Sequence, residues 1–333
     1  MRGAGKTVFS GSKIEEFQVE ILGVLENVGP KQSLILARFS GGPLAETGIL
    51  QGMSGSPVYV DGKLVGAVAM AFPFSKQPIG AIRPIEEMLV IRTMGPERPL
   101  RAGVSLLEKD LTQPLARPEE VLAGSSRMVD IATPVSFGGF TRRTIEHFAP
   151  QLRALGLEPR QGITGGGRPA RQPAKASLSP GDMISVMLVT GDMSVGADGA
   201  ITYVDGRNIY AFGHRFLSIG TTDLPFARSD VLTLLPSLAS SFKISAPREF
   251  MGTITEDRNM AVAGELGRHA SLVPVSVAVT RRSAGNTAQN RLSYRIEMVN
   301  DRFLSPFLVQ MVVFSAIDAT ERAVGSSSLS VRG

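Results

Sequence analysis

The stretch that decides the fold is GMSGSPVYVDGKLVG, residues 52–66. It opens with a serine between glycines, and glycine tolerates the positive φ angles that a sharp turn needs. It continues with Asp61-Gly62 between two apolar runs, which is the strongest short signal for a β-hairpin. We therefore expect a tight turn that presents Ser54 and leads directly into a rigid hairpin.

A serine in such a turn suits nucleophilic attack on an amide. The attack needs an accessible hydroxyl and backbone N–H groups that point at the oxyanion as it forms. A turn through Gly52, Met53 and Ser54 predicts such an oxyanion hole, with the Gly52 and Ser54 amides converging on one point. An ordinary Gly-Ser turn between strands is the alternative, because such turns are common. The added Pro57 and hairpin favour a catalytic serine.

A serine nucleophile needs a base, and the chain contains three histidines. His147 lies off the apolar stripe of an amphipathic helix predicted for residues 141–155, so we expect it on the surface. His269 lies in a glycine-rich turn without catalytic neighbours in the sequence. His214 ends a predicted strand, Asp-Gly turn and second strand over residues 199–214, where functional sites are often built. His214 is therefore the candidate general base.

The serine motif and the segment Ala211-Phe212-Gly213-His214 resemble the SpoIVB peptidase family, the sporulation stage IV B serine peptidases of the trypsin-like clan. The likeness covers about residues 5–93 and 180–267. It implies a serine endopeptidase with two trypsin-like β-barrel halves, Ser54 as nucleophile and His214 as general base. In the sporulation peptidase the histidine half comes first, so the two halves are permuted here. Triad geometry does not depend on chain order.

The third member of the triad is not fixed by the resemblance. The family's acidic residue lies shortly upstream of the serine, and the matching residues 37–43 contain no carboxylate. We take Asp223, nine residues after His214, as the acid, with Asp198 and Glu46 as further candidates. Each of these also suits a turn. A Ser-His dyad, or a carbonyl that orients the imidazole, is the other arrangement.

The resemblance also implies substrates and a location. The substrate would be a protein or peptide, either the chain itself or an envelope signalling protein. Residues 66–71 would line the specificity pocket and favour uncharged side chains. The location would be extracytoplasmic, although no apolar segment after Met1 resembles a secretion signal. We therefore expect an upstream signal or anchor, which would also allow peripheral association with the envelope. The alternative function is an inactive scaffold that binds peptides or envelope partners.

Short β-type runs between glycine and proline breaks predict a mainly β fold with a few short helices. One such run is strand-like, Met128–Ala132, and residues 229–243 have the apolar spacing of a buried helix. We divide the chain into a serine half (1–98), a connecting region with one helix and a flexible Gly/Pro/Arg linker (99–179), a histidine half (180–267) and a C-terminal β extension with a polar tail (268–333).

Composition excludes several other classes. The chain has no cysteine and three dispersed histidines, which argues against thiol chemistry and a metal site, and we expect no cofactor. The net charge is +5, but the basic residues are scattered without interleaved aromatics, which argues against nucleic-acid binding. The longest apolar run, residues 64–74, is too short to cross a bilayer.

Overall fold

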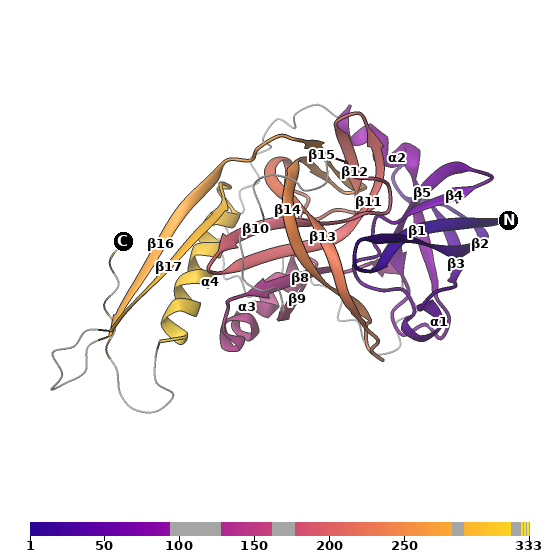
Figure 1. The fold of residues 1–333 in the computed structure, drawn as a ribbon. Helices are drawn as coiled ribbons and strands as arrows, with labels where there is room; N and C mark the ends of the chain where they lie inside the picture. The colour runs from indigo at the N-terminus through magenta and orange to yellow at the C-terminus, as the bar shows by residue number, and fades with distance from the viewer. Residues whose placement is uncertain are drawn as a thin grey trace.

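The computed structural model describes residues 1–93, 128–161, 177–281 and 290–320, together with 328, 330 and 332. These residues form two β-sheets and a few short helices (Figure 1), which confirms the mainly β fold. None of the helices in these ranges is long and apolar enough to cross a membrane.

The first sheet is a closed barrel built by the N-terminal part of the chain. Its strand order is β4-β1-β2-β3-β6-β5, and the pairing of β4 with β5 closes the ring; β7 is added on β5. All of its pairs are antiparallel. The strands are β1 (Arg2–Ser10), β2 (Lys13–Gly29), β3 (Gln32–Ser40), β4 (Pro57–Val60), β5 (Lys63–Ala71), β6 (Ile79–Pro84) and β7 (Val129–Asp130).

The second sheet closes in the same way. Six of its strands follow the order β10-β13-β14-β15-β12-β11, and β10 also pairs with β11. The pairs β8–β9 and β16–β17 extend this ring on either side of that junction. The strands are β8 (Thr133–Gly138), β9 (Leu157–Gln161), β10 (Met183–Gly191), β11 (Ser194–Asp205), β12 (Asn208–Ala211), β13 (Gly220–Leu235), β14 (Phe242–Arg258), β15 (Ala261–Leu266), β16 (Leu272–Arg281) and β17 (Asn290–Val299).

The helices cover the ends of these sheets. The first barrel carries α1 (Leu44–Thr47), α2 (Ile85–Leu89) and the 3₁₀ helix η1 (Val90–Arg92). The second sheet carries α3 (Arg142–Ala154) and α4 (Leu304–Asp318), which lie together under the β16–β17 extension (Figure 1). The predicted helix over 141–155 is thus confirmed, and His147 is exposed as expected, with its ring stacked on Phe314. No sequence pattern described above indicates α4.

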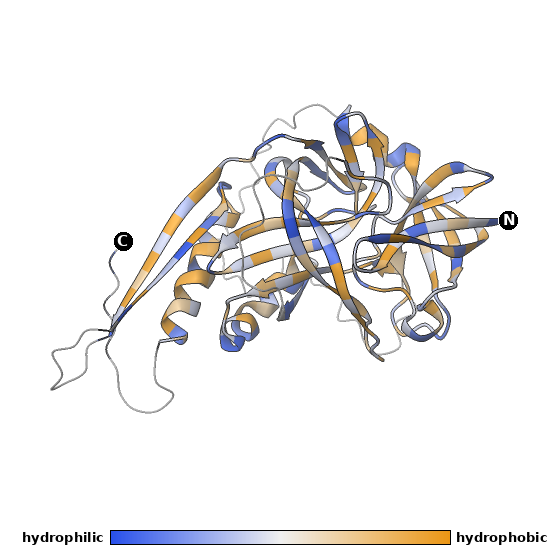
Figure 2. Cartoon of the chain, in the orientation of Figure 1, coloured by the Kyte–Doolittle hydropathy of each residue, from blue (hydrophilic) through white to orange (hydrophobic). Residues whose placement is uncertain are grey.

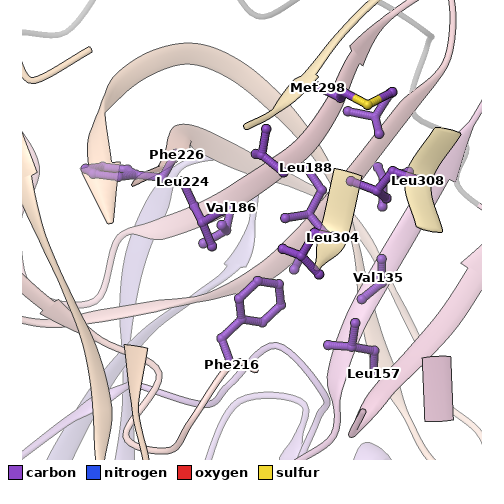
Figure 3. Packing of buried hydrophobic residues seen from close by; sticks show 14 of the residues in the cluster. Val135, Leu157, Val186, Leu188, Phe216, Leu224, Phe226, Met298, Leu304 and Leu308 are labelled. Carbon is purple, nitrogen blue, oxygen red and sulfur yellow. The ribbon is translucent and has the colours of Figure 1, made fainter. Parts of the chain in front are cut away.

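Each barrel has its own apolar core. Figure 3 shows part of the core of the second sheet, where side chains of β10 and β13 meet those of α4; the residues are Val186, Leu188, Leu224, Phe226, Leu304 and Leu308. Apolar and polar residues alternate along β16 (Figure 2), and the apolar set packs against this core. The first barrel has a separate core that includes Phe17, Phe39 and Met53. The serine turn lies where the two barrels meet, because Ser54 O and Gly55 O accept hydrogen bonds from Ala200 and Thr202 of β11.

Local turn chemistry was read correctly in several places. Asp61 and Gly62 have φ angles of 49° and 73° and join β4 to β5, as the Asp-Gly signal predicts. The strand, turn and strand before His214 are β11 and β12. The predicted C-terminal β extension contains β16 and β17, whereas most of the residues predicted as a flexible linker fall outside the described ranges.

One prediction was wrong. Residues 229–243 are not a helix but the end of β13, the hairpin turn and the start of β14. Val231, Leu234, Leu235 and Leu238 fit a helical spacing, but a stretch this short also suits a strand. Pairing of β13 with β14, and of Gly11 with Val231, decides the outcome through contacts with distant residues.

Candidate active site

The turn that carries Ser54 is built by two glycines in the left-handed region. Gly52 has a φ of 89° and Gly55 a φ of 88°, values that residues with a side chain rarely adopt. The Met53 N–H donates to Leu50 O at 3.0 Å within the same turn. The sharp glycine turn before the hairpin is therefore present as the sequence predicts.

The amides of this turn fall into two kinds. The Met53 amide is used inside the turn, and the Gly55 amide donates to Val68 O at 2.8 Å. The Gly52 and Ser54 amides have no acceptor among the described residues. Of the three residues predicted for the oxyanion hole, two therefore have a free N–H, and Met53 does not. Ser54 itself is fully buried, and its Oγ has no hydrogen-bond partner within the described part of the chain.

His214 lies at a corner that follows β12. Phe212 and Gly213 have φ angles of 71° and 69°, so the chain turns back on itself directly before the histidine. The Nδ1 atom lies 2.6 Å from Arg215 O. Because a carbonyl only accepts, Nδ1 carries the hydrogen of the neutral ring, which leaves the Nε2 lone pair free. Nε2 is buried, and none of the residues that the structure describes forms a hydrogen bond with it.

Burial lowers the pKa of His214 below its ordinary value, because a charged imidazole loses its hydration there. The negative charge of Asp130 opposes this effect and raises the pKa, whereas the positive charge of Arg83 adds to the lowering. The neutral ring is thus the favoured form. Asp130 belongs to the stretch Met128–Ala132, which the sequence marked as strand-like and not as part of a site.

One carbonyl group of β5 links the serine turn to the histidine corner. Val68 O accepts the Gly55 N–H at 2.8 Å, and a Cβ added to Gly213 would lie 3.2 Å from the same oxygen. Gly55 directly follows Ser54, and Gly213 directly precedes His214. Two segments that are far apart in the sequence and belong to different barrels therefore meet at one point of β5.

A second set of hydrogen bonds holds the segment that follows His214. The Asp257 carboxylate on β14 accepts the N–H groups of Phe216 at 2.9 Å, Leu217 at 2.7 Å and Ile219 at 3.3 Å. Asp257 is fully buried, and burial raises its pKa while these hydrogen bonds lower it. No sequence pattern marked Asp257, because the partners belong to a different element.

The structure does not bring Asp223 to His214. The Asp223 carboxylate accepts the Ser271 N–H at 2.8 Å and lies 3.6 Å from the Arg268 guanidinium. Its charge is not among those that shift the pKa of His214. Glu46 is exposed on α1. The acidic side chain whose charge raises the pKa of His214 is Asp130.

The remaining candidate, Asp198, belongs to a buried polar cluster beneath the serine turn. Burial raises its pKa to about 6, and the charge of Lys243 opposes this. The Lys243 Nζ donates to Thr7 Oγ1 at 2.7 Å, and Ser56 Oγ donates to the same atom at 3.0 Å. The lysine stem lies under Gly52, where an added Cβ would be 3.4 Å from its Cδ. This cluster joins the two barrels and was not predicted.

Comparison with known proteins gives one family. A family model described as SpoIVB peptidase S55 matches residues 4–89, which include the first barrel and the serine turn. No curated protein and no solved structure gives a significant match. The matched segment ends before His214. The resemblance inferred from the sequence is thus confirmed for residues 4–89, and this part of the chain is similar to the SpoIVB-type serine peptidases.

Proposed function

We propose that the protein is a serine endopeptidase in which Ser54 is the nucleophile and His214 the general base. The observation that carries this proposal is the meeting of the serine turn and the histidine corner at the Val68 carbonyl. Ser54 Oγ and His214 Nε2 both lack a hydrogen-bond partner among the described residues. A buried polar atom without a partner costs free energy, and a catalytic role is one explanation for such an atom.

The proposed reaction follows the acyl-enzyme route. Ser54 Oγ attacks the peptide carbonyl carbon, while His214 Nε2 takes the serine proton and then gives it to the leaving amine. The free Gly52 and Ser54 amides bind the carbonyl oxygen as it becomes negative. A water molecule, activated by the same imidazole, then releases the acyl group. Burial favours this chemistry because it keeps His214 neutral and able to accept a proton.

The Arg215 carbonyl performs the orienting task that an acid performs in a triad. Its contact with Nδ1 fixes the tautomer in which Nε2 can accept a proton. Asp223 is therefore replaced in the proposal by this carbonyl, which was one of the alternatives weighed from the sequence. The protein substrate, its processing in the cell envelope and any peripheral association with the envelope remain part of the proposal, and they rest on the family resemblance.

A second candidate function is a scaffold that binds peptides without cleaving them. The observation in its favour is that Ser54 is fully buried and that its Oγ makes no hydrogen bond with His214. A nucleophile that is never reached by solvent cannot react. The two functions differ in whether Ser54 becomes accessible in solution.

The test is labelling with an active-site-directed fluorophosphonate. We expect the folded protein to gain one covalent adduct, located on Ser54 by mass spectrometry, and Ser54→Ala to gain none. Ser56→Ala is the matched control, because this serine belongs to the same turn but donates to Thr7, and it should keep the label. A folded protein that stays unlabelled on Ser54 under all conditions described below supports the scaffold.

A further inference from the structure

The strand β5 has β6 on one edge and β4 on the other. The short strand β7 lies on the second edge, beyond the end of the β4 pairing, where no other described strand pairs with β5. β4 pairs with β5 only over Lys63–Ala67. Beyond this point β7 takes the same side, with Asp130 opposite Met70 and Val129 opposite Ala71 in antiparallel register. An open strand edge of this kind accepts an extended polypeptide through backbone hydrogen bonds.

The edge of β5 that β7 covers directly follows Val68, the residue that contacts the serine turn. The Ile131 N–H donates to Ala69 O at 2.9 Å. The preceding carbonyl, Val68 O, accepts the Gly55 N–H beside Ser54. Residues 129–131 therefore run along β5 next to the serine turn, bonded as an added strand would be.

The same segment also lies close to the histidine corner, because its Ile131 N–H is bonded to Ala69, and a Cβ added to Gly213 would lie 3.4 Å from the Ala69 Cβ. The charge of Asp130 is the main electrostatic influence that raises the pKa of His214. Ser54 and His214 are 0% and 2% exposed, and no solvent reaches Ser54 Oγ or His214 Nε2. Residues 129–131, called the internal segment below, therefore lie at the place where Ser54 Oγ and His214 Nε2 are shielded from solvent.

The side chain of Ile131 is fixed as well as its backbone. It is 4% exposed and belongs to the apolar core of the first barrel, together with Leu50, Met53 and Val68. Leu50 lies two residues before Gly52 and Met53 directly after it in the serine turn. An aliphatic side chain is thus held beside the turn that would carry out the reaction.

The internal segment is docked but not engaged for cleavage. In a reacting peptide the carbonyl oxygen before the scissile bond would accept hydrogen bonds from the oxyanion-hole amides. The Gly52 and Ser54 amides donate to no carbonyl among the described residues, that of Ile131 included. The segment accordingly resembles an inhibitor bound at the edge more than a substrate in position.

We infer that residues 129–131 occupy the substrate-docking edge of β5 at Ala69–Ala71 in the resting protein and so inhibit it. The inference rests on the proposed function. The substrate would be an extended polypeptide that pairs antiparallel with this edge and places an aliphatic side chain where Ile131 lies. It has to displace the internal segment before Ser54 can react.

The test measures the rate constant of fluorophosphonate labelling of Ser54 in wild type and in Ile131→Ala. Truncation of a buried isoleucine weakens docking of the segment, so labelling should accelerate by at least about tenfold. Ile296→Ala is the control, because Ile296 is similarly buried but lies on β17, far from the first barrel (Figure 1). It should label at the wild-type rate. Circular dichroism verifies that each variant is folded.

A second measurement uses a synthetic peptide with the sequence of residues 128–131, acetylated and amidated. It should slow the labelling of Ile131→Ala, and the same peptide with aspartate in place of isoleucine should not. Equal labelling of Ser54 in wild type and Ile131→Ala overturns the inference but leaves the proposed function intact. Absence of label from Ser54 in both folded proteins overturns the proposed function. A chain found cut after Ile131 contradicts the resting occupancy.

Discussion

At the scale of single residues, Gly55 carries the largest backbone constraint at the site. A Cβ there would lie 2.1 Å from Ala200 O and 2.5 Å from Phe212 N, and both are backbone atoms that cannot turn aside. We expect Gly55→Ala to lower the free energy of unfolding by at least about 3 kcal/mol in urea denaturation. Gly11→Ala is the control, because Gly11 also has a positive φ but open space around it, and it should cost only about 1 kcal/mol. Equal losses would contradict the steric argument.

The protonation of His214 gives a second prediction. Labelling of Ser54 needs the neutral imidazole, so its rate should rise as the pH rises through the pKa of His214. Burial lowers this pKa, and the midpoint of the pH–rate profile should lie below 6.5. Asp130→Asn removes the charge that favours imidazolium, so its midpoint should be lower still. Asp223→Asn should leave the midpoint unchanged, because its carboxylate is bonded to Ser271. A midpoint that moves only in Asp223→Asn would restore Asp223 as the orienting acid.

These residues also show what a sequence can and cannot reveal about a site. Ser54 was found because its turn depends on local φ angles, and glycine, serine and proline at fixed spacing express that requirement. His214 was found by elimination among three histidines. Asp130, Asp257 and Lys243 were missed, since their importance comes from contacts with residues that are distant in the sequence.

At the scale of elements, the β13–β14 hairpin shows why a periodicity can mislead. The apolar residues of its tip suit a helix, but Leu238 is fully exposed and Leu235 is 44% exposed, so no helix face is buried there. The strands are determined by a long ladder of pairs between β13 and β14. Short local signals such as Asp61-Gly62 were reliable because the turn itself imposes the positive φ angles.

The hydrogen bonds that hold the segment between β12 and β13 allow a prediction at this scale. Asp257→Ala leaves the amides of Phe216, Leu217 and Ile219 without their acceptor in a buried position. We expect a loss of unfolding free energy of roughly 2–5 kcal/mol and slower labelling of Ser54, because this segment fixes His214. Asp257→Asn keeps one acceptor oxygen and should recover part of both quantities. Labelling that is unchanged in both folded variants would show that the segment does not position the histidine.

At the scale of the whole molecule, the two barrels are joined by polar contacts that the sequence does not announce. The Gln51 N–H donates to Ser241 O at 2.9 Å, and Thr202 Oγ1 donates to Gly55 O at 2.7 Å. The mainly β fold could be predicted from the strand patterns, and its division into barrels from the resemblance. The way in which they meet could not, because it depends on individual pairs across the interface.

Lys243 reaches across this interface, and its pKa allows a prediction of how stability depends on pH. Burial lowers its pKa to about 7, from 10.5 for an unburied lysine, and the charge of Asp198 offsets only part of this effect. Between these two values the unfolded chain binds more protons than the folded protein, so the free energy of unfolding rises with pH. From pH 7.5 to 9.5 the lysine should contribute a gain of about 1–3 kcal/mol.

Urea denaturation of wild type and Lys243→Met at pH 7.5 and 9.5 measures the contribution of Lys243 together with its effect on Asp198, because the charge of Lys243 acts on the pKa of that carboxyl. Wild type should gain stability relative to Lys243→Met as the pH rises. Lys63→Met is the control for the loss of one positive charge, because Lys63 is exposed on β5. The difference in unfolding free energy between wild type and Lys63→Met should be the same at both pH values. If the difference in unfolding free energy between wild type and Lys243→Met is also the same at both pH values, Lys243 Nζ is hydrated in solution. The contact between the barrels at Thr7 is then looser than the 2.7 Å hydrogen bond implies.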